Sequence, residues 1–169
     1  FMQQLMFMKN IAVVGGLLVL ASLGGVGLVW MCFASMAGHV ISRTWPLLII
    51  RWLSHVGDDA GSKSKPLAEQ ISTRSLAIAL SWCAAALTSS SCIAAVVLAG
   101  PDLLIPTITQ VLPVLKVLAA GCLASALVFI YLLRLFARRL QGFTGDCLGA
   151  TQQLCEIAFY LGCALALGS

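Results

Sequence analysis

The sequence predicts an all-α integral membrane protein, a polytopic helical bundle of about four transmembrane helices with its active-site loops in the cytoplasm. Two properties of the 169 residues predict this class: 60% of them are hydrophobic and only 9% are charged. Soluble domains are about 45–50% apolar and about 25% charged. Because the backbone polar groups inside a lipid bilayer need partners within the protein, long apolar segments are expected to form helices packed on helices.

Four apolar segments predict the membrane-spanning helices, at 11–33, 76–99, 117–133 and 157–167. The first two are long enough to cross about 30 Å of hydrocarbon at about 1.5 Å per residue, the third is just long enough, and the fourth is short. A further apolar stretch, 45–53, contains Arg51 and is predicted to lie at the membrane interface or to re-enter the membrane. Three prolines between 101 and 113 predict a non-helical connection.

The basic residues predict the orientation of the chain. Lys9 and Lys116 lie on one side of the predicted spans, and all the other lysines and arginines lie in the loops after the first and third spans. Cytoplasmic loops are enriched in lysine and arginine, so both loops are expected in the cytoplasm. No lysine- or arginine-rich run indicates binding to nucleic acid. The seven cysteines contain no C-x-x-C pair and are expected to be reduced.

The segment 142–150 together with Glu156 is the strongest candidate site. It places two carboxylates, Asp146 and Glu156, beside an apolar segment, where an ionised group is costly unless it binds a cation or takes part in chemistry. A helix beginning near Asp146, capped by Thr144 or by Asp146 itself, leaves room for a ligand at Gly149. Such a helix aligns four residues on one stripe: Asp146, Gly149, Gln153 and Glu156. Two glycines allow tight turns before it: Gly142 and Gly145.

Carboxylate oxygens in this arrangement suit Mg²⁺ held jointly by the protein and by substrate phosphates. The alternative is structural, with Asp146 as a helix cap and Glu156 as a solvated side chain at the membrane interface.

The loop 56–68 is the second candidate site. Glycine and serine let its backbone approach a phosphate, its lysines supply positive charge, and its aspartates could join a metal site. The residues concerned are Asp58, Asp59, Ser62, Lys63 and Lys65. The loop does not fit the Walker A pattern. The alternative is a solvated loop whose lysines only follow the positive-inside rule.

His39 and Arg43 form the third candidate, at the predicted cytoplasmic end of the first span. Four residues apart on a helix, they share a face, and Arg43 could hold a phosphate. The alternative is that His39 is an interfacial side chain without a ligand.

Taken together, these segments resemble the second half of the cobalamin synthase family, the adenosylcobinamide-GDP ribazoletransferases. The matching pieces are 39–43, 55–68 and 142–150 with Gln153 and Glu156, and the resemblance covers about residues 30–169. It implies a multi-pass transferase of the bacterial inner membrane in cobalamin biosynthesis. Such enzymes join adenosylcobinamide-GDP to α-ribazole or its 5′-phosphate, release GMP and require Mg²⁺.

The resemblance also implies roles for individual residues. The catalytic group would be Asp146, Glu156 and Arg43. Mg²⁺ would be bound by Asp146 and Glu156, and Asp58 and Asp59 could join this metal site. Pyrophosphate oxygens would be stabilised by Arg43, Lys63 and Lys65. The remaining substrate-binding residues would be Ser62, Gly142, Thr144, Gly145 and Gln153.

Two features depart from the family. The H-x-D-G-L-A-D-type acidic motif of its N-terminal half is absent, and residues 1–28 instead weakly resemble the tail of a DoxX-type membrane protein. We therefore expect a transmembrane segment of uncertain family at 1–29 and a cobalamin synthase-like domain at 30–169. The chain is therefore expected to be a fragment or a fusion. Its possible partners are a missing N-terminal half or further copies of itself. Alone, it is expected to have little or no synthase activity. The alternative is a non-catalytic multi-pass protein, either a transporter or a DoxX-like accessory subunit.

Overall fold

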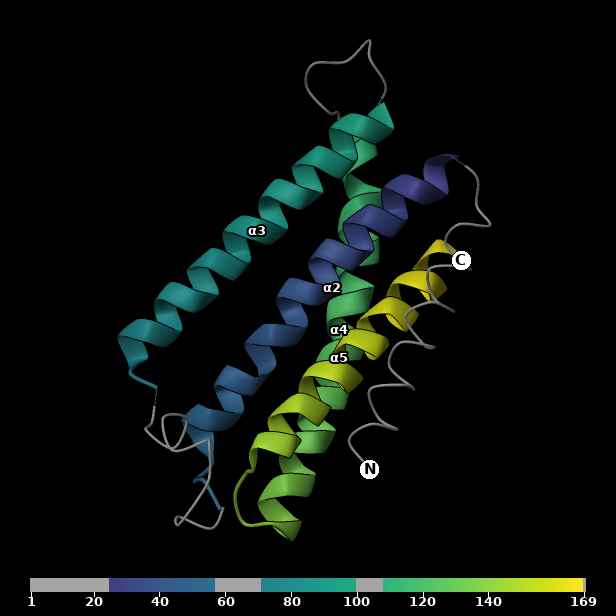
Figure 1. The fold of residues 1–169 in the computed structure, drawn as a ribbon. Coiled ribbons are helices and arrows are strands. Elements are labelled where there is room, and N and C mark those ends of the chain that lie inside the picture. Colours follow the sequence, from purple (N-terminus) through teal and green to yellow (C-terminus); the bar gives the residue numbers. More distant parts are fainter. Residues whose placement is uncertain (1–24, 57–70, 100–107, 169) are drawn as a thin grey trace.

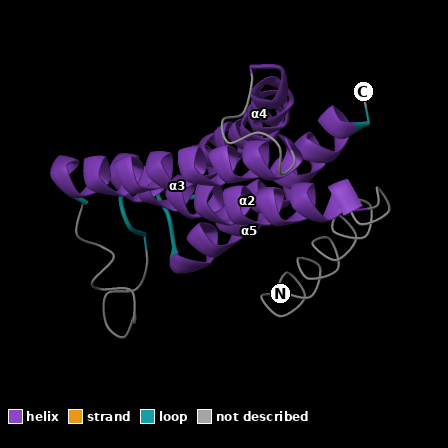
Figure 2. Ribbon diagram, turned by 90° about the horizontal axis from the view of Figure 1, so that it is seen from above, coloured by secondary structure: helices purple, strands orange, loops and turns teal. Residues whose placement is uncertain are grey.

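The computed structural model describes residues 25–56, 71–99 and 108–168, and within these ranges the chain is helical, as the sequence predicts. Four helices follow one another: α2 (Gly25–Trp52), α3 (Thr73–Ala99), α4 (Ile108–Arg139) and α5 (Gly145–Leu167). Helices α2 and α4 run in one direction and α3 and α5 in the other (Figure 1). Viewed from above, the described part contains only helices and their connections (Figure 2).

Three of these helices are long and apolar enough to cross a membrane by length and composition: Thr73–Val97, Val111–Arg139 and Gly145–Leu167. They confirm the predicted spans at 76–99, 117–133 and 157–167. The last span is longer than predicted, because α5 begins at Gly145 and has 23 residues. Its polar residues Thr151 and Glu156 are buried against other helices, so they do not shorten the span.

The first predicted span has different limits in the structure. Residues 11–24 lie outside the described residues, and from Gly25 the helix continues without a break to Trp52. The prediction that 45–53 is a separate or re-entrant piece is therefore wrong for 45–52, which form the last two turns of α2. Their position at the membrane interface stays a prediction. Ile49 is fully buried there. Arg51 did not interrupt the helix because it lies in the last turn, from which a long side chain reaches water.

The predicted non-helical connection at 101–113 is also shorter than expected. Residues 101–107 lie outside the described residues, but α4 begins at Ile108 and contains Pro113. A proline so close to the start of a helix removes only one backbone hydrogen bond near its end, and membrane helices tolerate such a loss.

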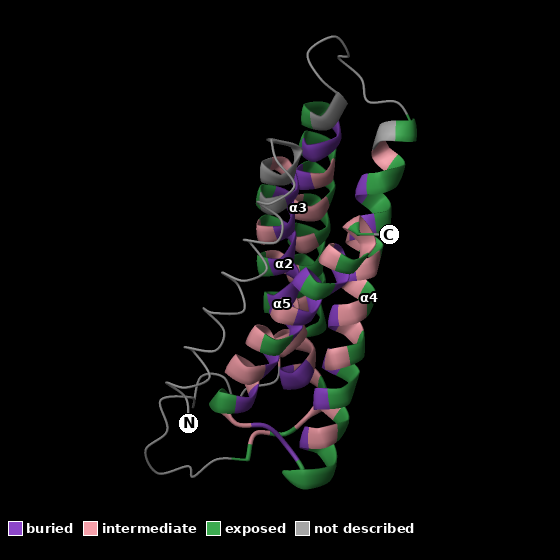
Figure 3. Ribbon diagram, turned by 90° about the vertical axis from the view of Figure 1, so that its right-hand side faces the viewer, coloured by how far each residue is buried: buried purple, intermediate pink, exposed green. Residues whose placement is uncertain are grey.

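Helix α5 packs against both α2 and α4, whereas α3 packs against α2 and α4 from the other side. The buried residues line the facing sides of α2, α4 and α5, and exposed residues cover their outer sides (Figure 3). Glycines make the contact between α4 and α5 close. A Cβ atom at Gly162 would lie 2.6 Å from the carbonyl oxygen of Ala120 and 2.9 Å from the Cα of Gly121. Small residues of this kind let membrane helices approach closely.

A side chain at Gly162 should therefore destabilise the bundle. We expect Gly162→Ala to lower the free energy of unfolding by about 1–3 kcal/mol, since the added methyl group meets backbone atoms that cannot rotate away. Thermal unfolding in detergent micelles measures the effect. Gly149→Ala is the matched control, because no atom of the described residues lies within 4 Å of a Cβ at Gly149. Equal losses in the two variants would contradict the assignment of Gly162 to close packing.

Candidate functional site

The connection between α4 and α5 is bound to the segment that follows α2. The Val56 backbone N–H donates to the Phe143 carbonyl and the Phe143 N–H donates to the Ser54 carbonyl, both at 2.9 Å, which makes an isolated parallel bridge. A Cβ at Gly142 would collide with the Ser54 carbonyl oxygen, so the close approach requires glycine. The segment 142–146 and the start of the predicted phosphate loop therefore meet at one end of the bundle.

At this end, α5 begins with a well-formed cap. Thr144 has an extended backbone (φ −121°, ψ 167°) and its side chain accepts a hydrogen bond from the Cys147 N–H at 3.4 Å. Of the two caps that the sequence allows, the structure thus uses Thr144. Asp146 lies in the first turn, where negative charge favours the helix dipole, and it is exposed. Its carboxylate is therefore accessible to a ligand at the end of the bundle.

The structure does not bring Asp146 and Glu156 together. Ten residues separate them, which corresponds to about 15 Å along the axis of α5. Glu156 is also only 5% exposed, deep in the bundle. One metal ion cannot bind both carboxylates at that separation, and Glu156 is not a solvated interfacial side chain.

Glu156 instead belongs to a polar cluster with Tyr160 and His39. The Tyr160 hydroxyl donates a hydrogen bond to Glu156 Oε1 at 2.9 Å, and His39 Nδ1 of α2 lies 3.8 Å from the same oxygen. Gly38 makes this approach possible, because a Cβ there would lie 2.6 Å from the ring of Tyr160. The i, i+4 spacing of Glu156 and Tyr160 is a signal in the sequence for their contact. The contact with His39 depends on how α2 crosses α5, and the sequence does not show it.

His39 does not lie at the end of a helix, as the predicted limits of the first span would place it. It lies near the middle of the 28-residue helix α2, because that helix continues to Trp52. Its side chain is 53% exposed. Arg43 follows one turn later, in the direction of the 142–146 segment, and is also exposed.

Space is open on the side of α5 that carries the predicted stripe. No atom of the described residues lies within 4 Å of a Cβ built at Gly145 or at Gly149. Gln153 Oε1 is buried and has no hydrogen-bond partner in the part of the chain that the structure describes.

Arginines gather at the same end of the bundle. They lie in the last turn of α2, at the start of α3 and in the last turns of α4: Arg51, Arg74, Arg134, Arg138 and Arg139. Lys116 lies toward the opposite end of α4. The predicted residues Asp58, Asp59, Ser62, Lys63 and Lys65 lie outside the described residues.

Among the described residues, no three His, Cys, Asp or Glu side chains lie close enough to hold a metal ion. Of the acidic side chains that the structure describes, the one at the arginine-rich end of the bundle is Asp146. Mg²⁺ often takes one or two protein carboxylates and completes its shell with phosphate oxygens and water. The described residues therefore fit a Mg²⁺ ion that arrives with a phosphate, and they do not form a closed metal site.

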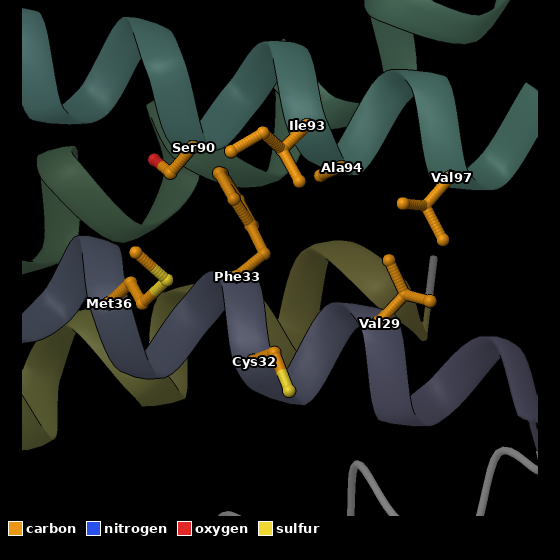
Figure 4. A pocket seen from close by; sticks show the side chains of 8 residues that line it. All are labelled: Val29, Cys32, Phe33, Met36, Ser90, Ile93, Ala94 and Val97. Atoms are coloured by element: carbon orange, nitrogen blue, oxygen red, sulfur yellow. The ribbon is translucent and has the colours of Figure 1, made fainter.

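A separate pocket of about 260 Å³ lies between α2 and α3. Figure 4 shows its lining, in which Ser90 supplies the oxygen and the other side chains are apolar. Ser90 already donates to the Leu87 carbonyl. This pocket suits hydrocarbon and offers no charge to a phosphate.

Comparison with known proteins agrees with the predicted resemblance. The family model described as cobalamin-5-phosphate synthase matches residues 8–164, a range that includes most of the segment 1–29. The proteins named adenosylcobinamide-GDP ribazoletransferase include relatives from Albidiferax ferrireducens and Polaromonas naphthalenivorans. The first is 49% identical over 88% of this chain and 51% of its own length, and the second is 50% identical over 82% and 43%.

A more distant relative of the same name, from Vibrio cholerae, is 34% identical over 84% of this chain and 44% of its own length. The chain thus spans about half the length of the curated relatives it matches. No solved structure matches it.

The Thr144 cap gives a test of the α5 N-terminus. We expect Thr144→Ala to lower the free energy of unfolding by about 1 kcal/mol and to speed amide exchange at Cys147, because the first turn loses its side-chain acceptor. Thr144→Ser keeps the hydroxyl and should behave like the unchanged protein. A serine variant as destabilised as the alanine variant would show that the methyl group of Thr144, not its oxygen, holds the turn.

Proposed function

The chain belongs to the cobalamin-5-phosphate synthase family, and on that basis we propose that it acts in adenosylcobinamide-GDP ribazole transfer. In this reaction, adenosylcobinamide-GDP is joined to α-ribazole or its 5′-phosphate and GMP is released. The observation that best supports the proposal is the backbone pairing of Ser54 and Val56 with Phe143. It joins the segment 142–146 to the start of the loop 56–68, and the sequence predicts a phosphate site in each. A non-catalytic transporter or accessory subunit gives no reason for this arrangement.

The proposed chemistry is a displacement at phosphorus. A ribose hydroxyl oxygen of the acceptor forms a bond to the phosphorus that carries the cobinamide ester. The bond from that phosphorus to the bridging oxygen breaks, GMP leaves with the bridging oxygen and its electron pair, and the hydroxyl proton passes to water. Catalysis of such a step consists mainly of positioning the two groups and neutralising the phosphate charge.

The residues of this chain contribute to positioning and to charge. Mg²⁺, when bound with the nucleotide, would neutralise phosphate charge, and the exposed carboxylate of Asp146 would hold it. Arg43 would bind phosphate oxygens from the α2 side, because its guanidinium offers several donors in one plane. The turn at Gly142 and Gly145 would leave space for the nucleotide beside the cap. The roles of Lys63 and Lys65 stay predictions.

The proposed location is the bacterial inner membrane, with the arginine-rich end of the bundle in the cytoplasm. The distribution of the described arginines supports this orientation, since positive residues concentrate in cytoplasmic segments. It also places the site on the side of the membrane where nucleotides are found. The assignment of 1–29 to a separate domain and the assembly of the chain into oligomers stay predictions.

Asp146→Asn tests the proposed function. In the complete polypeptide that carries this sequence, reconstituted in lipid, we expect the variant to lower Mg²⁺-dependent turnover at least about 100-fold, because one charge at the phosphate site is lost. Membrane insertion should not change, since the side chain is exposed. Asp146→Glu keeps the charge and should need more Mg²⁺ for half-maximal activity. Turnover of Asp146→Asn with an unaltered Mg²⁺ requirement would remove Asp146 from the metal site.

A further inference from the structure

Two polar side chains occupy places where a membrane helix normally presents apolar ones. His39 lies near the middle of α2 with 53% of its side chain exposed, and Arg43 is exposed one turn further on. On the outer side of α4, the corresponding positions carry leucines: Leu123 (64% exposed) and Leu127 (60% exposed). Charged and polar groups inside a bilayer face the protein interior or a water-filled cavity. The Trp45 indole of α2 donates to the Ser125 hydroxyl, near the middle of the α4 span Val111–Arg139, so this part of α2 lies at the depth of that span. On that placement, the side of α2 that carries His39 and Arg43 is not expected to face lipid.

Buried polar groups of α5 lie next to this side of α2. Glu156 lies near the middle of α5 and is held by Tyr160, with its Oε1 3.8 Å from His39 Nδ1. A carboxylate near Nδ1 favours a ring orientation that leaves Nε2 for another partner. Gln153 adds a buried oxygen that has no hydrogen-bond partner among the residues that the structure describes.

Gly149 lies between Asp146 and Gln153 on α5. Glycine inside a helix costs about 0.5–1 kcal/mol relative to alanine, so it needs a reason. Gly38 and Gly162 have one, because a Cβ at either position would collide with a neighbouring helix. At Gly149 no described atom lies within 4 Å of a Cβ. Packing against the described residues does not account for this glycine, whereas the close approach of a ligand to the backbone does.

We propose that His39, Arg43, Gly149 and Gln153 line a water-accessible cavity that runs from the N-terminal end of α5 to about the middle of the membrane. It holds the phosphate-bearing part of a nucleotide. Arg43 and the Nε2 of His39 supply donors to phosphate oxygens, and Glu156 fixes the orientation of His39 without touching the ligand. The cavity follows from the placement of the polar side chains alone, and the identity of its ligand rests on the proposed function.

Cysteine labelling tests the cavity without requiring enzyme activity. The four cysteines that are not buried (Cys32, Cys83, Cys92 and Cys122) are replaced by alanine, and the buried ones are kept. Single cysteines are then introduced as His39→Cys, Arg43→Cys and, as controls of similar depth and exposure, Leu123→Cys and Leu127→Cys. The proteins are placed in lipid nanodiscs and treated with a charged, membrane-impermeant maleimide.

We expect the cysteines at 39 and 43 to react at least about tenfold faster than those at 123 and 127, because thiols facing hydrocarbon do not meet the reagent. GDP or pyrophosphate with Mg²⁺, at about ten times its dissociation constant, should slow the reaction at 43 about tenfold, since only unoccupied protein reacts. Equal rates at 39 and 123 would overturn the cavity. Fast labelling that neither GDP nor pyrophosphate slows would overturn the phosphate ligand.

Gly149→Leu provides a second test in the unaltered cysteine background. A leucine would fill the proposed ligand space without meeting a described atom at its Cβ. We expect the GDP-induced rise in melting temperature to be lost while the melting temperature without GDP stays the same or rises. A variant that keeps the GDP response would place the ligand elsewhere. Loss of turnover with intact labelling and intact GDP binding would count against the proposed reaction and not against the cavity.

Discussion

The crossing of α5 with α2 and α4 is the contact on which the rest of the structure depends. Three glycines make it possible: Gly38 against Tyr160, and Gly121 and Gly162 against each other. Lipid tails are as apolar as leucine, so membrane helices are held together by close packing and by hydrogen bonds between them. The same approach brings the buried carboxylate of α5 to the histidine of α2. Packing and the polar cluster therefore have one structural cause.

This crossing divides the predicted carboxylate stripe into two parts with different environments. Asp146 lies at the end of the bundle beside the arginines, whereas Glu156 lies about 15 Å deeper along the helix. A single ion cannot reach both. The predicted stripe therefore covers two separate environments and does not mark one point of binding.

Much of the fold was predictable because it follows from composition and local pattern. The spans in α3 and α4 follow from the length of their apolar segments, which the sequence shows directly. The Thr144 cap follows from a threonine placed just before a helix start, which the sequence also shows. The C-terminal limit of α2 was not predictable, because a charged residue inside an apolar stretch normally indicates that the span is interrupted. Arg51 lies in the last turn of α2 and does not interrupt the helix. The contacts of His39 with Glu156 and of Ser54 with Phe143 join residues far apart in the chain, so only the tertiary structure shows them.

The energetics of Glu156 show why its position needs a functional account. Taking an ionised carboxylate out of water costs several kcal/mol, and a hydrogen bond to a charged group returns about 1.5–3 kcal/mol. The bond from Tyr160 offsets part of that cost. Apolar groups of similar volume often replace buried charges without loss of stability. Stability alone therefore does not require a glutamate at position 156. The proposed cavity gives this glutamate a role, because its Oε1 lies 3.8 Å from Nδ1 of the exposed His39.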